Sequence, residues 1–201
     1  MKIKNTFLFL TGVLLISSCA SVKVDDKTVE YYSQLEYPKK IYVSQFDTAK
    51  GIWDVDRSGS ELSDFKKNAS AELQFMMVER FREIAPTSNT PKSLPGSGML
   101  VKGEFKKINQ GSRALRMGIG FGAGGTKVEA LVKIYNLAKS KTKPAVSFRT
   151  TGGSNAQPGL IAGGLLTAPI FAAANSTGLT SDWERTSREV RNFILNNADK
   201  K

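Results

Sequence analysis

The sequence contains no histidine, and among its 201 residues it has one cysteine, Cys19. Without histidine the chain has no Ser-His or Cys-His nucleophile and no His-ligated metal site. A single cysteine excludes an intrachain disulfide and a cysteine-rich zinc site. These absences favour a protein that is not an enzyme and that needs no metal or cofactor.

Acidic residues are scarce relative to basic ones. The chain has 18 Asp and Glu against 29 Lys and Arg, which gives a formal net charge of +11. Apolar residues make up 40% of the chain, so it can bury a core and is not wholly disordered. Its length suits one domain of ordinary size with an additional segment.

The N-terminal residues have the order of an export signal. Lys2 and Lys4 are followed by an apolar run at 7–16, which is too short to span a bilayer permanently, and then by two serines. Residues 15–19, Leu-Ile-Ser-Ser-Cys, resemble the lipobox of bacterial lipoproteins. This resemblance implies a signal peptide at 1–18 and acylation of Cys19. The alternative is a plain signal peptide with an incidental cysteine.

The residue after the cysteine indicates which membrane holds the protein. Among lipoproteins with this signal, Asp at that position tends to mean retention at the inner membrane, so Ala20 favours the outer membrane. We expect residues 19–38 to be anchor and tether, with the protein facing the periplasm. A basic protein there meets anionic lipid headgroups, phosphorylated glycolipid or acidic wall polymer, and not nucleic acid. The alternative is that the excess Lys and Arg keep the surface soluble.

Two segments have the apolar periodicity of amphipathic helices. A capping box at 58–61 predicts the start of the first helix, behind which apolar residues recur at spacings of three and four as far as Ile84. A second capping box at 181–184 predicts another helix, whose apolar stripe reaches Ile194. Each helix has one apolar face, so both are expected to cover the same side of a sheet.

Four segments rich in β-branched and aromatic residues predict strands. The strand-helix-strand opening favours one parallel pair, and the short later connections favour antiparallel neighbours. The fold class is therefore α/β of the α+β type. We expect a single two-layer sandwich over 39–201, in the order β-α-β-β-β-α, with a mixed sheet and both helices on one face. The predicted strands are 40–46, 99–109, 126–137 and 145–151.

Two stretches resemble a known family. The glycine-rich run from Gly111 to Ala130 resembles the bacterial lipoproteins of domain-of-unknown-function family 4410, and residues 150–155 and 158–159 fit the same family. The resemblance extends from about Ile41 to Phe193. Because the family has no established activity, it implies the fold and the compartment and no catalytic residue. The architecture is similar to that of envelope lipoproteins that form rings for secretion, which is a likeness of fold only.

The glycine-rich run also contains Gly120-x-Gly122-x-x-Gly125, the spacing of a dinucleotide-binding loop. That motif needs a helix after it to hold the pyrophosphate, whereas a predicted strand follows here. We therefore expect a long hairpin tip, in which glycine permits positive φ angles and the close approach of another surface.

Basic residues flank this run and form a candidate anion-contact cluster. Arginine can hold a phosphate through two parallel hydrogen bonds. The alternative is that these side chains pair with carboxylates such as Glu104 and Glu129 or stay solvated. The cluster consists of Lys106, Lys107, Arg113, Arg116 and Lys127.

Charge is absent from Thr150 to Ser181, and residues 159–174 are nearly all apolar or small. This run is too short to span a bilayer as a helix, and Pro169 interrupts it. We expect an insertion at about 152–178 that contacts a membrane or a subunit, the alternative being burial under its own domain. The candidate contact residues are Gly159, Gly163, Gly164, Leu165, Ala168 and Ala172.

Three further patterns are weak. Residues 54–59 resemble the first half of a calcium loop, but Phe65 stands where that loop needs a bidentate glutamate. Ser63 and Lys66 have the spacing of a Ser-Lys pair without its companion motifs, and Ser154 lies in a near miss to a nucleophile elbow.

The sequence as a whole favours a non-enzymatic cell-envelope lipoprotein that acts by contact, assembling with itself or with an envelope complex. The alternative is a module that binds anionic lipid or glycolipid headgroups through the basic cluster, and a hydrolase is a distant third.

Overall fold

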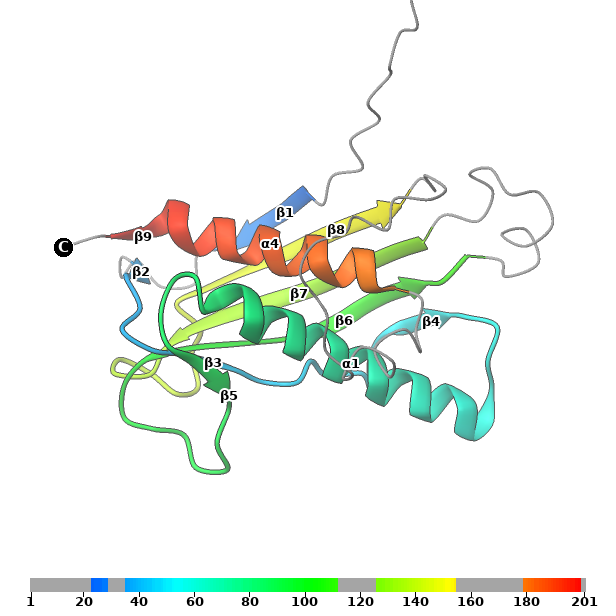
Figure 1. Cartoon of the computed structure of the whole chain (residues 1–201), viewed down its shortest axis with the longest axis horizontal. Helices are drawn as coiled ribbons and strands as arrows, with labels where there is room; N and C mark the ends of the chain where they lie inside the picture. The colour runs from blue at the N-terminus through cyan, green and yellow to red at the C-terminus, as the bar shows by residue number, and fades with distance from the viewer. Residues whose placement is uncertain (1–22, 29–34, 112–125, 155–178, 200–201) are drawn as a thin grey trace, which may run out of the picture.

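The protein, seen in a computed structural model, folds into two layers: a curved sheet and a pair of helices packed on one of its faces (Figure 1). The structure describes residues 23–28, 35–111, 126–154 and 179–199. The two-layer α+β architecture with both helices on one face is confirmed.

Three long antiparallel strands form the middle of the sheet. They are β6 (Met99–Asn109), β7 (Thr126–Asn136) and β8 (Val146–Ser154), which pair in that order. On the other side of β6 lies β3 (Ile41–Val43), which runs parallel to it. One parallel pair followed by antiparallel neighbours is the topology that the order of elements predicts.

The structure adds short strands that the sequence pattern does not reveal. Strands β4 (Ile52–Asp54) and β5 (Thr87–Asn89) run parallel to β6 and β3, respectively. Within the described residues, seven strands make one sheet in the order β1-β8-β7-β6-β3-β5, with β4 beside β6. Segments of three residues carry too little periodicity to be recognised, and their pairing depends on remote neighbours.

Part of the segment predicted as a tether is paired with the domain instead. Strand β1 (Lys23–Thr28) runs antiparallel to β8 at the edge of the sheet. Strand β2 (Leu35–Glu36) pairs with β9 (Ala198–Asp199) near the C-terminus. Both pairings use backbone N–H and C=O groups at the edge of a neighbouring strand. The polar composition of residues 20–38 does not reveal that such groups are available.

The two helices are α1 (Gly59–Phe81) and α4 (Thr180–Asn197). Both lie where the apolar periodicity predicts them. The predicted capping boxes are wrong, because neither forms the expected side-chain hydrogen bond at the helix N-terminus. Ser58 is the N-cap of α1 and its side chain makes no capping hydrogen bond. The N-cap of α4 is Leu179, so the predicted box lies inside the helix.

The core lies between the helices and alternate residues of the strands. On β7 these are Val128, Ala130, Val132 and Ile134, all buried. The Phe105 ring on β6 lies at the centre, 5.6 Å from the ring of Trp183 on α4 and 5.4 Å from that of Trp53. Gly103 leaves room there, because a Cβ at this position would lie 2.3 Å from the Leu131 carbonyl oxygen.

The sheet has two ends that differ in what emerges from them. At the loop-bearing end, β6 ends at Asn109, β7 begins at Thr126, β8 ends at Ser154, and both helices begin (Figure 1). At the far end lie the start of β6 and the turn between β7 and β8. Among the described residues no helix packs on the opposite face of the sheet, which is called the uncovered face below, although Leu94 covers a small buried cluster around Leu100 there.

Candidate interaction surfaces

The loop-bearing end brings together the attachment points of both unusual segments. The glycine-rich run connects β6 to β7, which are antiparallel neighbours, so the predicted hairpin is confirmed. Thr126 at the start of β7 pairs directly with Ser154 at the end of β8. The uncharged segment therefore leaves the sheet beside the point where the glycine-rich run returns to it.

Several predicted site residues lie outside the described part of the chain. They are the anchor Cys19, the cluster members Arg113 and Arg116, and the contact residues Gly159, Gly163, Gly164, Leu165, Ala168 and Ala172.

The described members of the basic cluster lie on the uncovered face. The Lys106 ammonium is 2.6 Å from a Glu104 carboxylate oxygen, and Lys127 is 2.7 Å from Glu129. The hydrogen bond from Lys106 lowers the pKa of Glu104, helped by the charges of nearby lysines and opposed by burial. Two members of the predicted cluster thus have carboxylate partners, whereas Lys107 is half-buried close to them.

Asp182 is a buried carboxyl group at the loop-bearing end. It lies in the first turn of α4, is fully buried, and accepts a hydrogen bond from the Thr126 hydroxyl. Its second oxygen is 3.9 Å from Arg185. Burial raises the pKa of Asp182, although the Thr126 hydrogen bond and the Arg185 charge act in the opposite direction. This contact ties the start of α4 to the start of β7.

The weak catalytic and calcium patterns do not come together. Asp54 on β4 accepts a hydrogen bond of 2.8 Å from the Asn109 side chain. Lys66 lies over the Trp53 ring, 5.4 Å from its centroid, while Ser63 is exposed on α1. Within the described ranges, no group of three or more acidic or cysteine side chains is placed to hold a metal ion.

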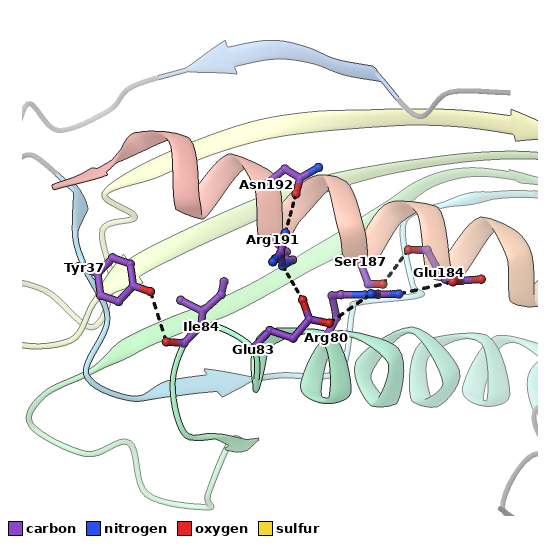
Figure 2. A network of polar contacts seen from close by, with 8 residues as sticks. All are labelled: Tyr37, Arg80, Glu83, Ile84, Glu184, Ser187, Arg191 and Asn192. Atoms are coloured by element: carbon purple, nitrogen blue, oxygen red, sulfur yellow. Dashed lines mark hydrogen bonds and ion pairs between the residues drawn. The ribbon is translucent and has the colours of Figure 1, made fainter. Parts of the chain in front are cut away.

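A polar network joins the two helices along their solvent side (Figure 2). Glu83, just after α1, is 2.9 Å from Arg191 of α4 and 3.3 Å from Arg80. Arg80 also reaches Glu184 at 3.4 Å, and Tyr37 donates to the Ile84 carbonyl at 3.4 Å. All four charged side chains are partly exposed. The network is therefore expected to contribute little to the free energy of unfolding.

The far end holds a hollow that no sequence pattern predicts. It has a volume of about 270 Å³, and its walls come from residues 35–40, the start of β6 and the end of β7. Tyr42, Met99 and Tyr135 line it and are themselves buried. Gly98 at the rim has a φ of +108°, and a Cβ there would lie 2.9 Å from the Tyr42 ring, so glycine suits this position.

Lysines gather around this hollow and its neighbour. Lys40 lies over the Tyr42 ring at 5.2 Å, Lys139 pairs with Glu36 at 3.1 Å, and Lys141 donates to a carbonyl oxygen. Lys143 lines a second hollow, of about 360 Å³, beside the turn between β7 and β8. Aromatic walls with ammonium groups at the rim suit an anionic ligand that has an apolar face. The sequence patterns do not reveal this cluster, because only the fold brings Lys139 to Glu36, close to Lys39 and Lys40.

The family model described as "Domain of unknown function (DUF4410)" matches residues 21–158. The chain belongs to this family. Membership in DUF4410 accords with the described α+β domain and assigns no role to any side chain. No curated protein matches the chain.

Two solved structures are similar in fold. Both are PelC dodecamers from Paraburkholderia phytofirmans, one of them a variant. Each alignment covers 89% of this chain and 99% of the other, at 12% identity and a TM-score of 0.45 for the variant and 11% and 0.43 for the second. Both scores lie below 0.5, so neither likeness bears on the assembly of this chain.

Neither described helix is long and apolar enough to cross a bilayer.

Proposed function

We propose that this protein is a non-enzymatic lipoprotein of the outer membrane, anchored through Cys19 and facing the periplasm, which acts by contact with itself or with other envelope components. The lipobox resemblance and membership in the family support the anchor and the compartment. The lack of histidine argues against a hydrolase.

One observation carries the contact role. Thr126 pairs with Ser154 across the sheet, and its hydroxyl donates to Asp182 at the start of α4. The glycine-rich run ends at Thr126. The uncharged segment runs from Ser154 to the start of α4. Two segments with compositions suited to close approach thus begin and end side by side on one end of the sheet.

The test is the mass of the acylated protein purified in mild detergent, with its co-purifying proteins identified. Leu165→Lys places a charge in the uncharged segment and should reduce the oligomer mass or the membrane contact while leaving the thermal midpoint nearly unchanged. The matched control, Thr142→Lys, adds the same charge in the exposed turn at the far end. If Leu165→Lys lowers the midpoint sharply, the segment is core and the proposal loses its main support.

The anchor needs its own test. Cys19→Ser should block acylation and leave the protein uncleaved or released from the outer membrane. A variant that still fractionates with that membrane and has a normal mature N-terminus would refute the lipoprotein assignment.

A second candidate function is anion binding, and the far-end hollow favours it. The predicted basic cluster has carboxylate partners for Lys106 and Lys127, whereas Lys39 and Lys40 line an aromatic-walled hollow. Binding of digalacturonic acid, a ring compound with carboxylates, should weaken with added salt and with Lys39→Gln plus Lys40→Gln. Lys106→Gln plus Lys127→Gln is the control with the same loss of charge. Equal effects of the two double variants would show that net charge alone attracts the ligand.

A further inference from the structure

Strand β1 determines where the N-terminal segment meets the domain. It runs antiparallel to β8, with Lys23 opposite Thr151 and Thr28 opposite Ser147. Because β8 ends at Ser154, β1 begins close to the loop-bearing end and runs towards the far end (Figure 1). Lys23, the first described residue, therefore lies near the loop-bearing end of the sheet.

The distance from this point to the anchor is short. Four residue steps separate Cys19 from Lys23, and a fully extended chain covers at most about 14 Å in four steps. The eleven residues of β7 span roughly 35 Å between the two ends of the sheet. A lipid on Cys19 can thus reach the loop-bearing end. The segment from Cys19 to Lys23 is much too short for an orientation in which only the far end faces the membrane.

We infer that the loop-bearing end is the membrane-facing surface of the domain, and that the lysine-rich far end points away from the lipid. This inference rests on the proposed anchor at Cys19. It adds to that function a defined contact surface, which includes the ends of β6 and β8 and the start of β7. The partner of this surface is the lipid bilayer.

The length of the tether argues against an inverted domain, and a domain lying on its side is the remaining competitor. Lysines 39, 40, 139, 141 and 143 would draw the far end towards anionic headgroups, but the tether prevents an inverted domain. A domain lying on its uncovered face would bring Lys102 and Lys133, which are opposite each other on β6 and β7, onto the lipid. The upright orientation instead turns towards the membrane the end from which the uncharged stretch 150–181 emerges, and there Lys106 and Lys127 are paired with Glu104 and Glu129.

The experiment uses the full acylated chain and one reporter at a time. Cys19 is the sole cysteine of the sequence and carries the lipid, so an introduced cysteine can be labelled uniquely with a polarity-sensitive dye. Three variants place the dye at the loop-bearing end (Ser181→Cys, exposed in the first turn of α4), on the uncovered face (Lys102→Cys) and at the far end (Thr142→Cys). Each protein is reconstituted on vesicles of phosphatidylethanolamine and phosphatidylglycerol that contain a headgroup quencher, and flotation measures the bound fraction.

The upright orientation requires several-fold stronger quenching at position 181 than at 102 or 142. Comparable quenching at 181 and 102, or at 181 and 142, would mean that the domain lies on its side and would overturn the inference, as would quenching strongest at 142. Loss of flotation for all three proteins would instead refute the anchor itself. The two failures are therefore distinguishable.

Discussion

The indole nitrogen of Trp183 on α4 donates a hydrogen bond of 2.9 Å to the carboxylate of Glu72 on α1. Both residues are buried, and 111 positions separate them along the chain. The same Trp183 ring packs 5.6 Å from the Phe105 ring of the sheet. A single side chain thus joins the two helices to each other and to the strand beneath them.

Trp183→Phe should therefore destabilise the domain more than its loss of size suggests. The variant removes a donor to a buried carboxylate, and hydrogen bonds to charged groups contribute about 1.5–3 kcal/mol. Urea unfolding measures the change in the free energy of unfolding. Trp53→Phe is the matched control, because its indole donates to the Thr48 carbonyl at a half-buried site. Equal losses in the two variants would contradict a special role for the helix-helix contact.

The exposed network around Glu83 should contribute much less. Glu83→Gln weakens its contacts with Arg80 and Arg191, whose partly exposed side chains stay hydrated. We expect a loss of less than about 1 kcal/mol, shrinking further at high salt. Urea unfolding at two salt concentrations tests this, and a larger, salt-independent loss would show that the network holds the helices together.

Gly103 should tolerate no side chain. Its Cβ would lie 2.3 Å from the Leu131 carbonyl oxygen and 2.5 Å from the Phe46 ring, so the strands would have to move. Gly103→Ala is expected to cost about 1–3 kcal/mol, the range of overpacked cores. Gly96→Ala is the control, since a Cβ there meets no atom within 4 Å. Thermal unfolding of the two variants should differ clearly, and similar midpoints would contradict the packing described here.

The buried carboxyl group of Asp182 should make stability depend on pH. Its pKa is raised by burial, so the folded state binds more protons than the unfolded state, and the contribution of Asp182 to stability falls as pH rises from below about 4 through its raised pKa. Asp182→Asn removes this titration and still accepts from Thr126. The midpoint of the variant minus that of the wild type should therefore increase from pH 4 towards neutrality.

Asp64→Asn, an identical change at an exposed position of α1, is the matched control and is measured over the same pH range. A flat profile for Asp182→Asn would show that its carboxyl group is solvated in solution.

The periodicity of the sequence predicts the largest elements well. Strand β6 has the predicted bounds, 99–109, and the predicted alternation of Val101, Gly103 and Phe105 holds as far as a shift of register between Phe105 and Lys107. Both helices follow from apolar stripes, and the hairpin follows from two alternating segments around a glycine-rich run. These are local properties, since each residue needs only its near neighbours in the chain to display the pattern.

Short strands and caps are less accessible to such reasoning. Strand β5 has three residues, and it is a strand because Ile41 lies opposite Thr87. Likewise, Ser58 has the residue type of a cap, but its side chain makes no capping bond in the fold. In both places the outcome depends on backbone partners that the local pattern does not contain.

The sequence by itself determined the absence of histidine chemistry, the two helices and the central strands, because composition and short-range periodicity are properties of the chain alone. Only the tertiary structure decided that Trp183 meets Glu72, that Lys39 and Lys139 lie at one end, and that β1 enters at the other. These contacts join residues far apart in the chain. They arise because the packing of two layers around one core selects a single register of strand pairing among the many that the same local patterns allow.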